Sequence, residues 1–530
     1  MNNPSRTRTI ASIFLVVFLV VSLMHVGFHM MCKKQTQNTA MPTRNQPPVT
    51  APGSASAPAQ TSSLSMQDET YVKLDKILQD KKNQLSDYIK MLNQNAESVL
   101  GDEIMLNCFS IMDAYFTLQQ VSPPPADMIH SMEELKNNAK QNYLRHYASF
   151  YDILFIDKKG DIFYTVRQQN DYKKNIFRGE LAKTALSNEL KPNTTKTFVD
   201  YQYYVFSGEP SAFIVIPVKM QGQFAGWIVF QCAINKINNM FTQDKDLGLT
   251  GEVFLVNKQD YMLTDSRFYG ESSILNRKLS QENIESKFRE KKGHKIVTDY
   301  RGFRVLSSFE VFDVGSSQWL IIAKIDEDEI ITERYKKSRP GIDAELLDAF
   351  AHMNFQACSI EPPDKRFVEV DMDEYRKVQT AESIGTYGVS TCTAIVVTMP
   401  GAFAYMGHIS NLDIAYGGQT TDIISHIMKQ IKTFDILKYE RRYLQVTVVA
   451  NHFNSISNII NALVNEGLFL SQIKFIYNGS AVYAAVDHNY IDNETHITWL
   501  MHRNTNEKYH QCASRTESVG DVASSLFDVE

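Results

Sequence analysis

Apolar side chains recur at three- and four-residue steps between about residues 67 and 98, in an otherwise charged stretch. This spacing places them on one face of a helix, so it predicts a long amphipathic helix over 67–98. A shorter helical region is expected near 103–120, and the prolines at 123–125 end it. The positions of the apolar stripe are Tyr71, Leu74, Ile77, Leu78, Leu85, Tyr88 and Ile89.

From about residue 150 the pattern changes to short apolar runs separated by polar turns that carry glycine, which is typical of antiparallel hairpins. A third hairpin is expected to begin at Gly251 and to turn through Asn257 to Asp260. The runs are 152–156 with 162–164, 212–218 with 226–231, 251–256, and 305–309 with 319–323. Two clusters of strands that follow one long helix predict two small antiparallel sheets in tandem, an α+β arrangement.

After residue 336 short helices alternate with β-rich runs to the end of the chain. Helices are expected at 344–353, 421–431 and 455–465, and strands at 393–398, 444–450, 473–477 and 481–486. We therefore predict a separate α/β domain over 337–530.

The segment Ile10–Met31 contains no charged residue and is long enough to cross a bilayer core of roughly 30 Å. We predict a transmembrane helix over 10–32, with 1–9 as a cytoplasmic N-terminus. A cleaved signal peptide is the alternative, although the apolar run is long for one and no small-residue cleavage site follows it. Residues 33–65 are rich in Pro, Ala, Ser, Thr and Gln, and are expected to form a disordered linker.

Composition excludes some functions. The net charge of −6 provides no basic surface for nucleic acid. The six cysteines show no CxxC pair and no zinc-ligand spacing, so no metal or cofactor is expected. Outside the cytoplasm some of them could pair as disulfides, and the sequence leaves the pairing open.

Three motifs carry a resemblance to a known sensor module. Phe198–Tyr201 with Pro210–Val218 resembles the membrane-distal half of double Cache domains from chemoreceptors and sensor kinases. Leu247–Val256 with Thr264–Phe268 resembles the start of the proximal half, and Tyr300–Leu306 with Trp319 its end. The resemblance implies a PAS-like double Cache sensor over 66–336, with a distal half at about 120–240 and a proximal half at about 241–332.

That resemblance also implies location and ligand. Such domains face away from the cytoplasm, so we expect a single-pass protein of the bacterial inner membrane, with most of the chain in the periplasm. The distal half of the family usually holds a small ligand, often an amino acid, amine or carboxylate. Candidates to bind it are Arg167, Tyr172, Arg178, Asp200, Tyr201 and Tyr203, with Phe177 beside them.

The chemistry of these candidates fits such a ligand. A guanidinium would pair with a carboxylate, Asp200 would receive an ammonium, and the aromatic rings would enclose the aliphatic part. The alternative is that Arg167 and Arg178 are solvated surface charges and that the tyrosines belong to the core.

In the C-terminal domain, Cys392 lies at the junction between a turn and a β-branched strand, and His408 lies near the end of the next apolar run. Two adjacent strands with this arrangement can bring a thiol and an imidazole together. The imidazole can take the thiol proton and create a nucleophile for an amide carbon. Backbone amides beside the cysteine could hold the developing oxyanion.

Thr386, Cys392 and His408 together resemble the CheD-type chemoreceptor glutamine deamidases. The resemblance implies that Cys392 is the nucleophile, that His408 is the general base and that Thr386 orients the histidine or the substrate amide. The interval from Cys392 to His408 is one residue shorter than in that family, and Ser390-Thr391 replaces its Gly-Ser. The family substrate lies in the cytoplasm, so an extracytoplasmic domain would need another substrate, such as a periplasmic peptide or protein amide.

The sequence thus predicts a sensor in signal transduction, of the kind found in chemotaxis, that is coupled to a cysteine-dependent amidohydrolase. The alternative is a non-catalytic protein whose C-terminal domain docks a signalling partner. A buried structural Cys392 and an ordinary His408 would agree with that alternative.

Overall fold

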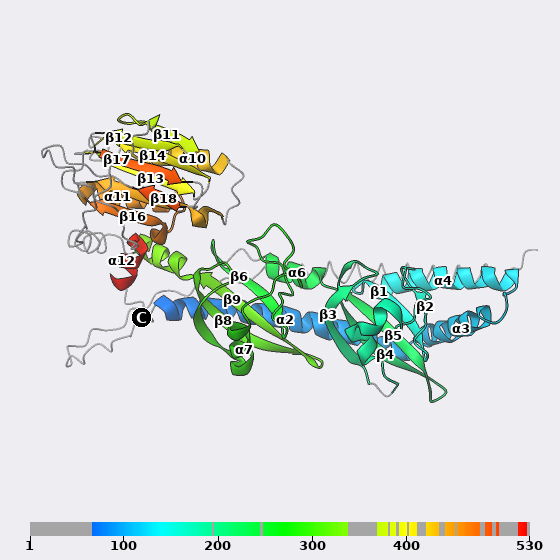
Figure 1. The fold of residues 1–530 in the computed structure, drawn as a ribbon. Helices are drawn as coiled ribbons and strands as arrows, with labels where there is room; N and C mark the ends of the chain where they lie inside the picture. The colour runs from blue at the N-terminus through cyan, green and yellow to red at the C-terminus, as the bar shows by residue number, and fades with distance from the viewer. Residues whose placement is uncertain are drawn as a thin grey trace, which may run out of the picture. The chain divides into compact units, whose positions relative to one another are not determined.

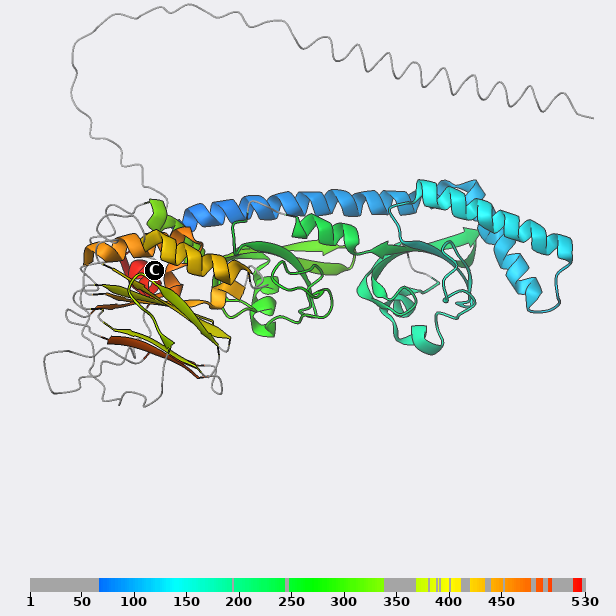
Figure 2. The ribbon, with the colours of Figure 1, turned by 90° about the horizontal axis from the view of Figure 1, so that it is seen from above.

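The computed structural model describes residues 66–192, 195–243, 247–337, 368–379, 382–387, 389, 392–399, 402–410, 420–433, 440–450, 453–477, 483–489, 494–497 and 518–526. Its first element is the long helix α2 (Met66–Ser98), which packs against strands of both sheets of the N-terminal part (Figures 1 and 2). Leu74, Leu78, Leu85 and Leu92 are buried at the three- and four-residue spacing of one helix face. This single helix therefore gives the two sheets a shared core.

Two further helices follow α2 before the distal sheet: α3 (Glu103–Gln119) and α4 (Ala126–His146). Asp102 caps α3, since its carboxylate accepts hydrogen bonds from the backbone N–H groups of Ile104 and Met105 at 3.0 and 3.1 Å. Helix α4, which the sequence analysis did not predict, begins directly after the three prolines.

The distal sheet is antiparallel, with strand order β2-β1-β5-β4-β3. Its strands are β1 (Asp152–Asp157), β2 (Ile162–Thr165), β3 (Thr197–Tyr204), β4 (Glu209–Met220) and β5 (Gln223–Ala233). The short helices η2 (Gly179–Lys183) and α5 (Ala185–Glu189) lie between β2 and β3. One face of the sheet joins the core under α2, and the other carries a separate apolar cluster around Leu154, Phe213 and Val229. Gly160 turns the chain between β1 and β2 at a φ of 91°, where a Cβ would lie 2.3 Å from the Phe177 ring.

The proximal sheet repeats this plan with the order β6-β9-β8-β7. Its strands are β6 (Glu252–Asn257), β7 (Lys292–Thr298), β8 (Arg304–Val314) and β9 (Ser317–Asp326); the helices α6 (Asn235–Thr242) and α7 (Gln281–Glu290) accompany it. The prediction of a third hairpin is wrong. The turn at Asn257–Asp260 forms, but only an isolated bridge joins Val256 to Met262, and the ladder partner of β6 is β9.

The C-terminal domain stacks helices and two sheets (Figure 1). A mixed sheet has the order β11-β14-β13-β15-β16, and a second has the order β10-β12-β17-β18. The strands are β10 (Val368–Glu369), β11 (Tyr375–Gln379), β12 (Ser383–Tyr387), β13 (Thr393–Met399), β14 (Phe403–Ile409), β15 (Gln445–Ala450), β16 (Ile473–Tyr477), β17 (Tyr483–Asn489) and β18 (Glu494–Ile497). The helices are α10 (Thr420–Thr433), α11 (Phe453–Asn465) and α12 (Val519–Leu526).

Helices α10 and α11 cover one face of the first sheet, and a small apolar cluster that includes Val370, Ile384 and Val396 lies between the two sheets. Ile331 and Tyr335, from the helical residues 327–337 that continue β9, belong to the helix-side core. The core of the C-terminal domain thus includes residues that directly follow β9.

Most of the predicted elements are confirmed, including α2, α3, α10, α11 and the strands of the C-terminal domain. The predicted membrane span at 10–32, the linker at 33–65 and the helix at 344–353 lie outside the described residues. In the described part of the chain, no helix combines the length and apolarity that crossing a bilayer requires.

Candidate functional site

Strand β3 carries three of the predicted ligand-binding residues, and their side chains lie in different surroundings. Tyr201 is buried in the core under α2, whereas the side chain of Tyr203 is 63% exposed. The Asp200 carboxylate accepts hydrogen bonds from Tyr201 N at 2.7 Å and from Trp319 Nε1 of the proximal sheet at 2.8 Å. Burial raises the pKa of Asp200, which these hydrogen bonds partly oppose. Asp200 thus joins the distal half to the proximal half through the hydrogen bond from Trp319.

The other predicted residues lie on the loop after β2. The exposed guanidinium of Arg167 stacks 4.3 Å from the centre of the Tyr151 ring and donates to the Tyr151 carbonyl. Arg178 is exposed, and half-buried Tyr172 has the Lys136 and Lys173 ammonium groups 5.6 and 5.2 Å from its ring centre. The structure therefore does not bring the six predicted residues together in one cluster.

A different set of polar groups is buried on the face of the distal sheet away from α2. Asp152 is 2% exposed; its Oδ1 accepts from the backbone N–H groups of Ile153 and Arg167, but its Oδ2 has no hydrogen-bond partner among the described residues. Burial raises the pKa of Asp152 to about 6, and the neighbouring Asp171 also raises it. Asp171 is fully buried; its Oδ2 accepts from Tyr204 Oη at 2.9 Å, and no group in the described part of the chain donates to its Oδ1.

Gln231 extends this set. It is the register partner of Asp152 across β1 and β5, and it is fully buried. Its amide nitrogen donates to Ser207 and Ser211 at 3.0 and 2.8 Å, which leaves its Oε1 without a donor. We call Asp152, Asp171 and Gln231 the acceptor cluster, because each has one buried oxygen that no described group satisfies.

Sequence reasoning missed this cluster. Its signal is a polar residue near the end of a mostly apolar strand: Asp152 opens β1, and Gln231 follows four apolar residues in β5. A buried polar atom without a partner costs about 1–3 kcal/mol, so such groups point to a ligand or a bound water.

In the C-terminal domain, Thr386 and His408 meet between the two sheets. Thr386 Oγ1 lies 2.7 Å from His408 Nδ1 and donates to the Val370 carbonyl at 2.6 Å. A hydroxyl has one proton, so Oγ1 must accept from Nδ1–H, and this leaves Nε2 as the unprotonated nitrogen. Nε2 is buried and has no partner among the described groups.

The surroundings of His408 keep it neutral. It is 2% exposed, and burial lowers its pKa, which Asp373 and Asp371 partly oppose. A neutral imidazole with a free Nε2 is the form that accepts a proton in general-base catalysis.

Cys392 lies just before β13, in the strand pair that holds His408. Ala394 is the register partner of His408, so Cys392, two residues earlier, is a diagonal neighbour of the histidine on the same side of the sheet. Cys392 is a buried free thiol. Within the described residues no hydrogen bond joins the thiol to His408.

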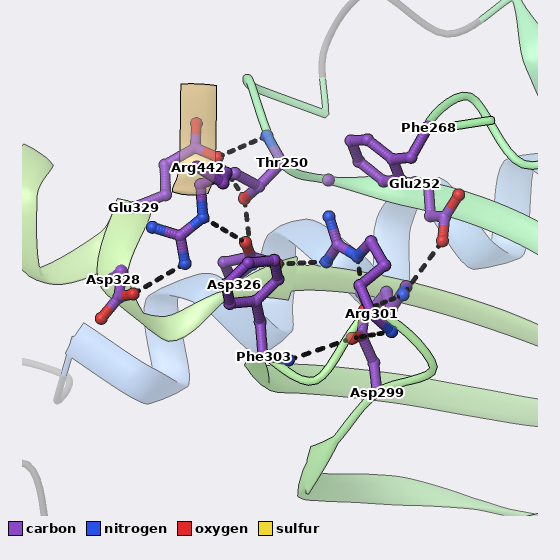
Figure 3. Close-up of polar contacts among 12 residues, drawn as sticks. Thr250, Glu252, Phe268, Asp299, Arg301, Phe303, Asp326, Asp328, Glu329 and Arg442 are labelled. Carbon is purple, nitrogen blue, oxygen red and sulfur yellow. Dashed lines mark hydrogen bonds and ion pairs between the residues drawn. The ribbon is translucent and has the colours of Figure 1, made fainter. Parts of the chain in front are cut away.

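The sensor and the C-terminal domain share a buried ion-pair network (Figure 3). Arg442, on the turn η3 (Glu440–Tyr443), places Nη2 2.7 Å from Asp328 Oδ2 and Nε 3.3 Å from Asp326 Oδ2. Its guanidinium carbon lies 4.3 Å from the centre of the Phe303 ring and 4.6 Å from that of Phe469. Asp326 is the last residue of β9 and is fully buried, which raises its pKa to about 6 despite its cationic neighbours. This contact links the sensor sheet directly to the C-terminal domain.

Arg442→Met should destabilise the protein by about 3 kcal/mol at pH 7.5, because two carboxylates lose a cation and one of them is fully buried. Without Arg442 the folded pKa of Asp326 rises further above its unfolded value, so the stability that the variant loses should return as the pH falls below about 6. Urea unfolding at pH 7.5 and 5.0 measures both effects. Arg304→Met, which removes an ion pair whose arginine is 65% exposed, should cost less than about 1 kcal/mol; equal losses in the two variants would contradict the prediction.

A model of the Cache domain family matches residues 62–334, which is more than half of the chain. The chain belongs to the Cache domain family. This match confirms the sensor resemblance, and the helix followed by antiparallel sheets agrees with it. The Cache domain match ends before the C-terminal domain, whose resemblance to glutamine deamidases stays a hypothesis.

Solved structures with similarity to this chain include ligand-binding domains of bacterial chemoreceptors. The domain of Pseudomonas fluorescens CtaA in complex with L-serine is 14% identical; the match covers 50% of this chain and 98% of that one, with a TM-score of 0.31. The domain of Pseudomonas aeruginosa PctB in complex with L-Arg is 15% identical, with coverages of 47% and 97% and a TM-score of 0.27. No curated protein matches the chain.

Proposed function

We propose that this protein is a membrane-anchored, extracytoplasmic sensor whose distal Cache half binds a small ligand that carries an ammonium group. The acceptor cluster supports this proposal most directly. An ammonium has three N–H donors, and Asp152, Asp171 and Gln231 each present one unsatisfied acceptor oxygen. Two carboxylates would also compensate its charge, which a neutral ligand or a water molecule would not do.

The rest of the ligand would face apolar and loop residues. Leu154 and Val229 lie on the same face of the sheet as the acceptor cluster, and they can contact an aliphatic part. If the ligand also has a carboxylate, as an amino acid does, Arg167 and Arg178 on the exposed loop remain the candidates to pair with it. Tyr172 remains the candidate to cover the aliphatic part from the loop side.

Ligand affinity should fall as the pH is lowered through about 6. An ammonium stabilises the ionised form of Asp152, so a proton on that carboxylate competes with the ligand. Below pH 6 the affinity should drop by up to roughly tenfold for each pH unit. Isothermal titration of full-length protein in detergent at pH 7.5, 6.0 and 5.0 measures this dependence. An affinity that rises on acidification would argue against carboxylate recognition.

The proposal itself is tested by a thermal-shift screen of the full-length protein with amino acids and short alkylamines, each beside its uncharged amide or alcohol analogue. A ligand that binds only the folded state raises the melting temperature by mass action. We expect stabilisation by amines and none by the uncharged analogues. Equal stabilisation by both, or by carboxylic acids alone, would reject an ammonium site in the distal half.

A second function, hydrolysis of a side-chain amide, is favoured by the Thr386–His408 hydrogen bond. This bond fixes the ring and leaves Nε2 free, as a general base beside a nucleophile requires. In this proposal Cys392 attacks the amide carbon of a glutamine side chain, ammonia leaves, and water hydrolyses the resulting thioester. The substrate would be a peptide or protein of the same compartment as the domain.

The alternative to catalysis is a C-terminal domain that docks a signalling partner. Whether the C-terminal domain is catalytic or a docking domain, the contact of Arg442 with Asp326 and Asp328 supports coupling between this domain and the sensor. Strand β9 runs through the proximal sheet and ends at that contact. Ligand-dependent changes in the proximal sheet would therefore reach the C-terminal domain through a buried charged contact.

A further inference from the structure

The proximal half contains a cavity of its own, between helix α7 and the face of the sheet that points away from α2. Its volume is about 80 Å³. Apolar side chains, among them Phe254, Ile284 and Ile322, line much of it. The polar groups of the wall come from α7, β8, β9 and the end of β7 with the turn after it. They include the ammonium of Lys287 and the carboxylate of Asp299.

Lys287 is buried, and among the described residues it forms no ion pair. It is 1% exposed; its Nζ donates to Asn283 Oδ1 on the same helix and lies 5.6 Å from the centre of the Phe309 ring. Glu290, the acidic group that acts on it, forms an ion pair with Lys295 instead. Burial lowers the pKa of Lys287 to about 8, and the cations Lys295 and Lys324 lower it further. At neutral pH the side chain is therefore still mostly cationic in an apolar setting.

The neighbouring cations, Lys324 and Arg301, do form ion pairs with carboxylates. Lys324 lies 3.0 Å from Glu252 Oε1 and also pairs with Asp299. Arg301 pairs with Asp299 at 2.7 Å and with Asp326, as Figure 3 shows. Three carboxylates thus compensate these two cations and part of Arg442, and in the described part of the chain none of them forms an ion pair with Lys287. An uncompensated buried ammonium is costly unless an anion joins it.

A second polar group in the wall also lacks a partner. Ser307 is 1% exposed and lines the cavity, and its hydroxyl makes no hydrogen bond within the described part of the chain. Ser307 is the register partner of Lys324 on the sheet, opposite the helix that carries Lys287. A bound carboxylate can accept from a lysine ammonium on one side and from a serine hydroxyl on the other.

We propose that the proximal half binds a short-chain monocarboxylate such as acetate or propionate, with its carboxylate on Lys287 and Ser307 and its alkyl part against Phe254, Ile284 and Ile322. One uncompensated ammonium matches one negative charge, so a phosphate dianion would leave charge buried without a partner. A space of about 80 Å³ admits a molecule of only a few heavy atoms. This site is separate from the acceptor cluster, and the inference does not depend on the proposed amine ligand.

Isothermal titration of the full-length protein in detergent with propionate, at constant ionic strength, tests the site; propionamide and propylamine are the matched uncharged and cationic probes. We expect saturable binding of propionate at a stoichiometry of one and no binding of propionamide at Lys287. Lys287→Met should weaken propionate binding at least tenfold, and Ser307→Ala should weaken it several-fold. Arg289→Met, which removes an exposed cation from the same helix, should leave it unchanged.

Thermal unfolding distinguishes a variant that has lost the binding site from one that does not fold. Lys287→Met removes a buried unpaired charge, so without propionate it should melt at a temperature equal to or above that of the wild type, and propionate should no longer stabilise it. Absence of propionate binding to the wild type would overturn the proposal. So would propionate binding that is undiminished in a folded Lys287→Met variant.

Discussion

Replacement of Asp171 by asparagine should weaken binding of an amine ligand by roughly 100-fold, because it removes a charge-assisted hydrogen bond from a fully buried position. The asparagine oxygen would keep the acceptor for Tyr204, so the amide nitrogen would occupy the place of Oδ1. A donor would then face the ammonium donor of the ligand. Titration of the wild type and the variant with the amine that stabilises the wild type most measures the loss.

Asp200→Asn tests whether the ammonium binds at the acceptor cluster or at Asp200, the residue that the sequence predicted to receive it. Asp200 holds Trp319 and Tyr201, so its asparagine variant should keep the ligand affinity within a few-fold. Asp171→Asn should fold normally, since burial of a carboxylate that faces no cation among the described residues does not stabilise the protein without ligand, and the asparagine oxygen keeps the bond to Tyr204. The opposite result, with affinity lost in Asp200→Asn and kept in Asp171→Asn, would return the ammonium site to β3.

Cys392→Ala should abolish release of ammonia from glutamine-bearing peptides, and His408→Ala should reduce it by roughly 10²- to 10⁴-fold, the range of a lost general base. Thr386→Val should have a smaller effect, about tenfold, because the imidazole remains but loses the group that fixes its tautomer. Ammonia release by the full-length protein, measured from pH 5 to 9, reports all three variants. Burial lowers the pKa of His408, so the activity should persist to a pH below the ordinary histidine range near 6.5 before protonation of Nε2 removes it.

Cysteine labelling gives an independent test that needs no substrate. Iodoacetamide labelling of Cys392, followed by peptide mass spectrometry, should slow by roughly tenfold in His408→Ala if the imidazole generates the thiolate. Cys232, a buried free thiol in the distal half whose pKa burial raises, supplies the control: Cys232→Ala should leave hydrolysis unchanged. If the wild type is inert toward every glutamine peptide and the labelling rate does not depend on His408, the C-terminal domain is better regarded as a docking domain.

Local patterns in the sequence determined most of the architecture. The stripe of apolar residues fixed α2, since burial of one helix face requires only a spacing of three and four residues. Short apolar runs between glycine turns fixed the hairpins β1–β2, β4–β5 and β8–β9, whose partners are close in sequence. The pairing of β6 with β9 brings together residues that are far apart along the chain, and no local signal announces it.

Of the two candidate sites, one could be predicted from the sequence and the other could not. Thr386, Cys392 and His408 were visible because a motif carries them at fixed intervals, and the structure joins Thr386 to His408 at 2.7 Å. The acceptor cluster was not visible, because a carboxylate at a strand end looks the same in sequence whether it faces water or the interior. Only the tertiary structure decides whether its oxygens find donors.

Sequence alone therefore determined the helix, most strands, the Cache resemblance and the candidate triad, all of which depend on neighbours in the chain. Tertiary structure alone decided which charged groups are buried without an ion-pair partner among the described residues: Asp171 in the distal half and Lys287 in the proximal half. The physical reason is that the cost of burying a charge depends on every group packed around it, and those groups come from distant parts of the chain.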